Sequence, residues 1–281
     1  MAKKALVVGI NDYAPIGIGG PDLNGCVNDA RDMANTLVIC GFPALSVRIL
    51  TNQNATKANI ISNLTNLVTT SKKGDSIVFY YSGHGTRVAN IGADFEVDGL
   101  DDAICPHDFA SAGVIRDDEF AAILKQLPTG VNMDAIFDCC HSGTGTRRMS
   151  LVDLDGNPTN EAARFIEPNL EDEFYFNHSK ELVEVKKESK TGTKQLVTTS
   201  KMNHALFAAC KDSQVAMEGN MGGVTRGYFT YNLCKILRAT NGEIKRSAID
   251  TQLSNALAAM GAAQINQTEG KTRELNQNIF K

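Results

Sequence analysis

The sequence predicts an α/β fold in which a mostly parallel sheet is covered by helices on both faces. Short apolar runs alternate along the chain with segments whose apolar residues recur at helical spacing. These runs are continuous, which is typical of strands buried on both faces. Of the 281 residues, 42% are hydrophobic and 21% are charged, a composition that supports a packed core and argues against disorder.

Five segments are predicted to be strands because each is a short run rich in apolar, β-branched or aromatic residues. The first, ALVVGI, ends at an Asn-Asp pair, and the third, SIVFYY, follows a Gly-Asp turn. The five expected strands are residues 5–10, 46–50, 76–81, 131–137 and 205–210.

Five other segments are predicted to be helices. The first, residues 26–39, repeats apolar side chains every three or four positions and stops at Gly41. The third, residues 120–127, stops at Pro128, because proline does not continue a helix. The expected helices are residues 26–39, 56–68, 120–127, 228–239 and 249–260.

Charge and hydropathy narrow the class of protein. The net charge is −4 and the isoelectric point is near 5.8, so the chain as a whole carries no strongly basic nucleic-acid-binding surface. No apolar run reaches the roughly 18 residues that a membrane span needs. The apolar run after Lys3 and Lys4 is too short for a secretory signal. We therefore expect a cytoplasmic protein with no nucleic-acid or membrane partner.

The seven cysteines have no regular spacing and include no CxxC pair. This pattern predicts free thiols, several of them buried, and makes a structural zinc site improbable. We expect one domain over residues 1–281, interrupted by a polar, charge-rich loop at about residues 150–201. A loop of this length is either a solvated insertion or a functional segment.

Two predicted strands end in residues that can carry chemistry. The third runs into Ser82-Gly83-His84-Gly85, and the fourth runs into Asp138-Cys139-Cys140-His141-Ser142-Gly143. Active groups gather at the carboxyl ends of parallel strands, and we expect these two strands to be neighbours. A thiolate is a strong nucleophile, and a nearby imidazole can take its proton. This pattern therefore favours nucleophilic catalysis by a cysteine paired with a histidine.

The motifs SGHG and DCCHSG, with His84 and Cys140 56 residues apart, resemble those of the metacaspases and their prokaryotic relatives, the orthocaspases. The resemblance extends over the segments VVGINDY, LNGCVNDA, DGLDDA, AACKD and GYFT. It implies a caspase-like fold and a cysteine endopeptidase. It makes Cys140, and not Cys139, the nucleophile and His84 its base, and it makes the backbone N–H groups of Cys140 and Gly85 the oxyanion stabilisers.

The resemblance also implies a substrate class. Metacaspases cleave after arginine or lysine, and the positions that line their specificity pocket correspond here to Cys26, Asp29, Ser82 and Asp138. A pocket for a basic side chain needs a desolvated carboxylate, and two are present among these four. Taken without the resemblance, Asp29 also fits an exposed helix carboxylate, or a carboxylate in the first turn that interacts with the helix dipole.

Two further properties follow from the same resemblance. Many metacaspases need calcium, and their ligands correspond to Asp101, Asp117 and Asp118, while Arg147 stands near the family's fourth acidic ligand. Asp153 or Asp155 could substitute, and a solvated acidic surface is the alternative. Such proteases also often cut themselves in a polar loop, for which the candidate residues are Arg147, Arg148, Lys180, Lys186, Lys187, Lys190, Lys194 and Lys201.

The main hypothesis is therefore a monomeric, calcium-stimulated, self-processing endopeptidase that acts on proteins or peptides after arginine or lysine. Two alternatives remain open: a catalytically silent caspase-like scaffold that binds partners, and a related cysteine peptidase of different specificity. A dinucleotide-binding domain is disfavoured, because the glycines after the first strand do not form GxGxxG.

Overall fold

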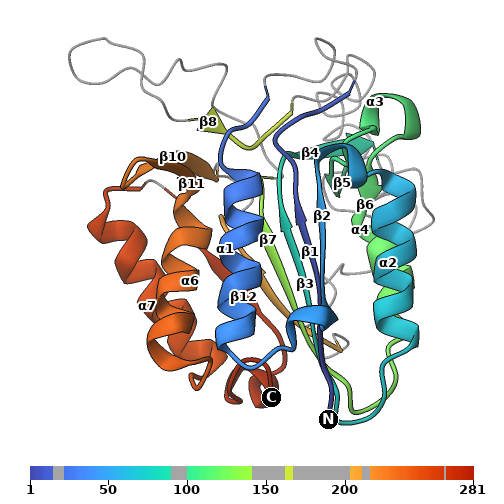
Figure 1. Ribbon diagram of the computed structural model, residues 1–281, viewed down its shortest axis with the longest axis vertical. Coiled ribbons are helices and arrows are strands. Elements are labelled where there is room, and N and C mark those ends of the chain that lie inside the picture. The colour runs from blue at the N-terminus through green and yellow to red at the C-terminus, as the bar shows by residue number, and fades with distance from the viewer. Residues whose placement is uncertain (15–21, 90–99, 141–161, 167–202, 211–215, 263) are drawn as a thin grey trace, which may run out of the picture.

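The computed structural model describes residues 1–14, 22–89, 100–140, 162–166, 203–210, 216–262 and 264–281. Its centre is a six-stranded sheet with the order β12-β9-β7-β3-β1-β2 (Figure 1). All neighbours pair in parallel except β12, which is antiparallel to β9. The strands are β1 (Lys3–Gly9), β2 (Val47–Thr51), β3 (Ser76–Ser82), β7 (Asn132–Asp138), β9 (Ala205–Ala208) and β12 (Gln267–Glu269).

Helices cover both faces of this sheet (Figure 1). On one face lie α1 (Cys26–Ile39), α6 (Tyr228–Thr240) and α7 (Arg246–Ala259), and on the other α2 (Lys57–Thr69) and α4 (Asp117–Leu124). The shorter helical elements are η1 (Ala44–Ser46), η2 (Asn52–Asn54), α3 (Phe109–Ala112) and α8 (Thr272–Leu275).

The central strand β3 shows why the sequence folds this way. All seven of its residues are buried. Val78 and Tyr80 face the core under α1 and α6, whereas Ile77 and Phe79 face the core under α2 and α4. A continuous apolar run is what a strand needs when both of its faces are covered. The predicted α/β class with a mostly parallel sheet is confirmed.

Two three-stranded sheets lie at the carboxyl edge of the main sheet (Figure 1), and neither was predicted. One consists of β4 (Gly85–Ala89), β5 (Leu100–Ile104) and β6 (Ile115–Arg116), and the other of β8 (Ala162–Ala163), β10 (Met217–Met221) and β11 (Val224–Gly227). Their strands are two to five residues long and partly polar, so they lack the apolar run that identifies the central strands.

The predicted strands and helices are present; α1 has the predicted bounds, and the bounds of the others are shifted. The helix expected at 120–127 begins three residues earlier, at Asp117, because the Glu119 side chain accepts the Arg116 backbone N–H at 3.1 Å and caps the first turn. The helix expected at 249–260 begins at Arg246. Of the polar loop expected at about 150–201, only residues 162–166 are described. Within the described ranges, no helix is long and apolar enough to cross a membrane.

A fully buried ion pair joins the main sheet to the helical layer. Arg246, the first residue of α7, bonds Asp134 of β7 through Nε and Nη2. The Asp134 carboxylate also accepts the backbone N–H of Phe280 at 3.2 Å. Each group therefore relies on the other, because an isolated buried charge is costly.

We predict that Asp134→Ala lowers the free energy of unfolding by about 3–5 kcal/mol, because it leaves the Arg246 guanidinium buried without its carboxylate. Denaturant unfolding measures the change. Replacing both partners with apolar residues, as in Asp134→Leu with Arg246→Met, should cost less than Asp134→Ala alone. An Asp134→Ala variant as stable as the wild type would contradict the role given to this pair.

Candidate active site

The two motifs start from the same edge of the sheet. Strands β3 and β7 are parallel neighbours, and Ser82 lies opposite Asp138 at their carboxyl ends. The Gly83 N–H donates to the Asp138 carbonyl at 3.4 Å, which extends the pairing past the strands. The expectation that His84 and Cys140 follow neighbouring strands is confirmed.

Tyrosine hydroxyls fix the backbone of His84. Its N–H donates to the Tyr13 hydroxyl at 2.7 Å, and its carbonyl accepts from the Tyr81 hydroxyl at 2.7 Å and from the Cys105 N–H at 3.0 Å. The imidazole is fully buried, and its centroid lies 5.0 Å from that of the Tyr13 ring. The loop that carries this histidine is therefore held from both sides.

Cys140 is fully buried, and its thiol lies against the backbone of Ala216. Its Sγ accepts the Ala216 N–H at 2.6 Å. Burial raises the pKa of the Cys140 thiol well above its usual range. Burial raises the pKa of the neighbouring Cys139 in the same direction, so burial does not distinguish the two cysteines.

The backbone N–H groups of Gly85 and Cys140 meet at one oxygen atom. Both donate to the carbonyl of Arg164, at 3.0 and 3.2 Å. Position 85 requires glycine, because a Cβ there would collide with the Cys140 carbonyl. Two converging N–H groups beside a thiol can stabilise a developing oxyanion.

The side chain of Arg164 lies in a cluster of acidic residues. Its Nη2 bonds Asp29 of α1 and, at 3.1 Å, Glu218 of β10. Its Nη1 bonds the Ser82 hydroxyl and Asp138 Oδ2, both at 2.9 Å. We call the four residues Asp29, Ser82, Asp138 and Glu218 the acidic pocket. Its three carboxylates and the guanidinium have at most 1% of their side-chain surface exposed.

The structure thus brings together three of the four predicted pocket residues directly around a guanidinium. Asp29 is fully buried, so the alternative of an exposed helix carboxylate is wrong. Cys26, the fourth predicted pocket residue, lies next to Glu218, with its Sγ 3.8 Å from Oε2 of that glutamate. Burial raises the pKa of the Asp29 carboxyl to about 7; Arg164 opposes this rise and Asp138 adds to it.

Glu218 was missed by the sequence analysis, and so were the glycines that make room for the guanidinium. Glu218 accepts the backbone N–H groups of Asn24 and Gly25 at 2.7 and 3.1 Å, which ties β10 to the start of α1. A Cβ at Gly227 would collide with Asp138 and Arg164. A single glutamate in the segment AMEGNM carries no local signal that separates it from a surface residue.

The predicted calcium ligands lie beside the small β4–β5–β6 sheet. Asp101 is on β5 and bonds Arg116 at 2.8 Å, while Asp117 and Asp118 form the first turn of α4. Burial raises the pKa of the Asp117 carboxyl to about 7, and Asp101 adds to the rise. Crowded carboxylates suit a hard cation. However, the described residues contain no group of three or more such side chains placed to hold a metal ion, and positions 147, 153 and 155 lie outside them.

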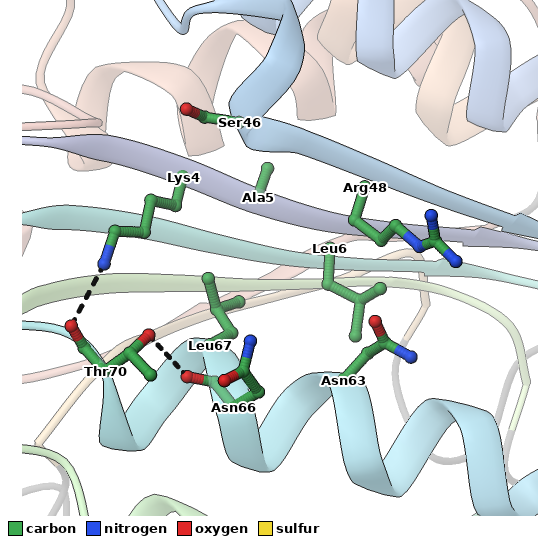
Figure 2. A pocket seen from close by; sticks show the side chains of 9 residues that line it. All are labelled: Lys4, Ala5, Leu6, Ser46, Arg48, Asn63, Asn66, Leu67 and Thr70. Carbon is green, nitrogen blue, oxygen red and sulfur yellow. Dashed lines mark hydrogen bonds between the residues drawn. The ribbon is translucent and has the colours of Figure 1, made fainter.

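A surface groove lies elsewhere on the molecule, between α2 and the amino-terminal half of β1 (Figure 2). Lys4 and Arg48 line it together with asparagines of α2 such as Asn63. It contains none of the predicted site residues. The acidic pocket is not an open cavity, because Arg164 fills it.

Comparison with known proteins gives the family. Residues 3–147 match the model of the metacaspase, peptidase C14 domain, which is more than half of the chain. Metacaspase-1 of Scheffersomyces stipitis is 44% identical over 151 residues, covering 50% of this chain and 36% of the relative. Metacaspase-1B of Aspergillus oryzae is 34% identical over 263 residues, covering 84% of this chain and 60% of the relative.

The chain belongs to the metacaspase family. The matched range includes His84 and Cys140, and also Asp29 and Asp138, which both contact the Arg164 guanidinium. This chain spans about a third to two fifths of the length of the first relatives, including Metacaspase-1 of Arabidopsis thaliana, which is 42% identical over 150 residues. A crystal structure of a Geobacter sulfurreducens protein superposes with a TM-score of 0.71 at 25% identity, covering 100% of this chain and 99% of that one. The metacaspase domain therefore has the expected caspase-like fold.

The eight basic residues considered for self-processing all lie outside the described residues. Arg164, which was not among them, is the basic residue found in the acidic pocket. Nothing local distinguishes it, because the partners that define its role are 26 to 135 positions away in the chain.

We predict that Arg164→Met destabilises this metacaspase domain, and that the loss grows with pH. Without the guanidinium, which holds the Asp29 pKa down, the carboxyl keeps its proton to higher pH in the folded state. A carboxyl whose folded pKa is raised destabilises the fold progressively as the pH rises from about 4, its value in the unfolded chain, through the folded pKa.

The deficit in Tm between variant and wild type should therefore be larger at pH 8 than at pH 5, and at pH 8 it should correspond to about 3–5 kcal/mol. Thermal unfolding across this range measures it. A deficit independent of pH would show that Arg164 contributes packing alone.

Proposed function

We propose that this metacaspase is a cysteine endopeptidase that cuts peptide bonds after arginine or lysine. The observation that carries the proposal is the placement of Arg164. Its guanidinium lies in the acidic pocket while its carbonyl accepts the N–H groups of Gly85 and Cys140. A substrate residue needs both contacts at once: one to recognise its side chain and one to stabilise the oxygen of the carbonyl under attack.

Cys140 is the proposed nucleophile and His84 the proposed base. Their positions after adjacent strand ends, and the convergence of the N–H groups of Gly85 and Cys140, support this assignment. His84 takes the thiol proton as sulfur attacks, and later gives it to the leaving amine. Burial raises the pKa of the Cys140 thiol, which makes a nearby base useful for removing its proton.

The pocket favours arginine over lysine. Both terminal nitrogens of the guanidinium are used: Nη1 by Ser82 and Asp138, and Nη2 by Asp29 and Glu218. A lysine ammonium is a single point charge, so it leaves some of these four side chains without a hydrogen-bond partner. Lysine is therefore a weaker substrate residue than arginine.

The remaining parts of the proposal follow from the family. A calcium ion would stimulate the enzyme, and Asp101, Asp117 and Asp118 would supply part of its ligand set, where a divalent cation would offset the crowded carboxylates. The enzyme processes itself, acts on protein or peptide substrates, and works as a cytoplasmic monomer. The edge strand β2 exposes the charged side chain of Arg48, which supports the monomer because edge charges oppose strand pairing between molecules.

Peptides that differ only in the residue before the scissile bond test the specificity. We expect kcat/KM to be highest for arginine, lower for lysine, and at least about a thousandfold lower for aspartate, because the aspartate would bring a fourth carboxylate, without a partner, into the acidic pocket. Cys140→Ala should abolish cleavage of all three peptides.

Glu218→Gln tests how the pocket recognises arginine, because glutamine keeps the size of glutamate and removes its charge. It removes one charge-assisted hydrogen bond to Nη2, so the preference for arginine over lysine should fall by about tenfold or more.

A protein that binds these peptides and cuts none of them would be the silent scaffold. Efficient cleavage after aspartate would refute the pocket assignment.

A calcium titration tests the metal. We expect millimolar Ca²⁺ to increase activity and to raise Tm by about 2–4 °C, the shift that about 1 kcal/mol produces in a domain of this size. Asp117→Asn should reduce both effects, since it removes a charged oxygen donor. If neither activity nor Tm responds to Ca²⁺ in the wild type, the metal proposal fails.

A further inference from the structure

The residues around Arg164 cross the site as an extended strand. On one side of Arg164, Ala162 and Ala163 form β8 and pair antiparallel with β10. The Arg164 N–H donates to the Ala216 carbonyl at 3.1 Å and continues this pairing. Adding a strand to an exposed edge is a common way to bind a peptide.

On the other side of Arg164, the segment is held by the start of β4. Phe165 bridges to Gly85, and the Ile166 N–H donates to the Gly85 carbonyl at 3.0 Å. The Thr86 hydroxyl donates to the Ile166 carbonyl at 2.8 Å. The segment is therefore anchored both before and after the Arg164–Phe165 peptide bond.

Arg164 occupies both places that any other substrate would need. Its guanidinium is fully buried among the three carboxylates, and its carbonyl takes the N–H groups of Gly85 and Cys140. The Cys140 thiol and the Arg164 N–H also share one anchor, since both bond the backbone of Ala216. A second peptide cannot reach the acidic pocket until this segment leaves.

We infer that residues 162–166 are a built-in substrate: the enzyme cuts its own Arg164–Phe165 bond, and the uncut segment keeps other substrates out. The inference rests on the proposed function, which supplies the chemistry. It adds the identity of the bond and the role of the segment as an inhibitor. Because the segment is already in place, the first cut is intramolecular.

The reaction balances as an ordinary thiol hydrolysis. Cys140 Sγ bonds to the Arg164 carbonyl carbon as its proton passes to His84, and the carbon–nitrogen bond to Phe165 breaks. The proton goes to the nitrogen, which becomes the new amino terminus at Phe165. Water then hydrolyses the thioester, which leaves a carboxylate on Arg164 and restores the thiol. The fragments are residues 1–164 and 165–281.

The time course of intact mass tests the inference directly. We expect wild-type protein to yield the fragments 1–164 and 165–281 as its first products, with a first-order rate that is unchanged over a hundredfold dilution. Cys140→Ala should stay whole. Cleavage at another bond before this one, or a rate proportional to concentration, would overturn the inference.

Binding separates inhibition from cleavage. In the Cys140→Ala background, which cannot cut, a peptide that ends in arginine should bind at least tenfold more tightly once Arg164→Met is added, as measured by calorimetry. Arg164→Lys is the matched control, because it keeps a cation in the pocket and should leave binding weak. Equal affinity in the Cys140→Ala protein with and without Arg164→Met would show that the segment does not block the pocket.

Failure of the inference is distinguishable from failure of the proposed function. Wild-type protein that cleaves arginine peptides while its Arg164–Phe165 bond stays whole refutes the inference and leaves the peptidase in place. Protein that cleaves neither refutes both. If Arg164→Met does not fold, the mass measurement on the wild type still decides.

Discussion

The site depends on how one buried positive charge is balanced. Three carboxylates from α1, from the end of β7 and from β10 surround one guanidinium in a region that excludes water. If all three carboxylates ionise, two negative charges remain uncompensated. Burial raises the pKa of Asp29 to about 7, and the neighbouring Asp138 adds to this rise. A cation inside the cluster therefore stabilises it. The same excess of negative charge suits the cluster to the basic substrate side chain that we propose it binds.

The fold makes this cluster possible through the parallel sheet. Because β3 and β7 run in parallel and in register, Ser82 and Asp138 end at the same level, and the loops that follow them meet. Gly85 lets the backbone pass close to the Cys140 carbonyl, and Gly227 lets it pass close to the Arg164 guanidinium. The buried Asp134–Arg246 pair holds α7 against the opposite end of β7.

The sequence was most informative where the signal is local. Apolar runs predicted the central strands, and glycine and proline marked several helix ends. The positions of His84, Asp29 and Asp138 followed from the family motifs, and the burial of Asp29 then excluded an exposed helix carboxylate at that position. The start of α4 was misplaced because its first turn is acidic, and polar side chains there cap a helix without contributing to an apolar pattern.

The parts that could not be predicted depend on contacts between distant segments. Glu218 reaches the start of α1 from 194 positions away, and Arg164 meets Asp29 from 135 positions away. Neither residue differs locally from a solvated charge. The short strands β8 and β10 matter because they pair with each other, and pairing between segments leaves no periodic signal in either one.

The measurement that bears most directly on the central claim is covalent labelling. A peptide with a terminal arginine and a thiol-reactive group, applied to Arg164→Met protein and mapped by mass spectrometry, reports both the nucleophile and the pocket. The account predicts rapid modification of Cys140 alone among the seven cysteines, and slow modification by the matched aspartate reagent. Equal rates for the two reagents, or modification of a different cysteine, would contradict it.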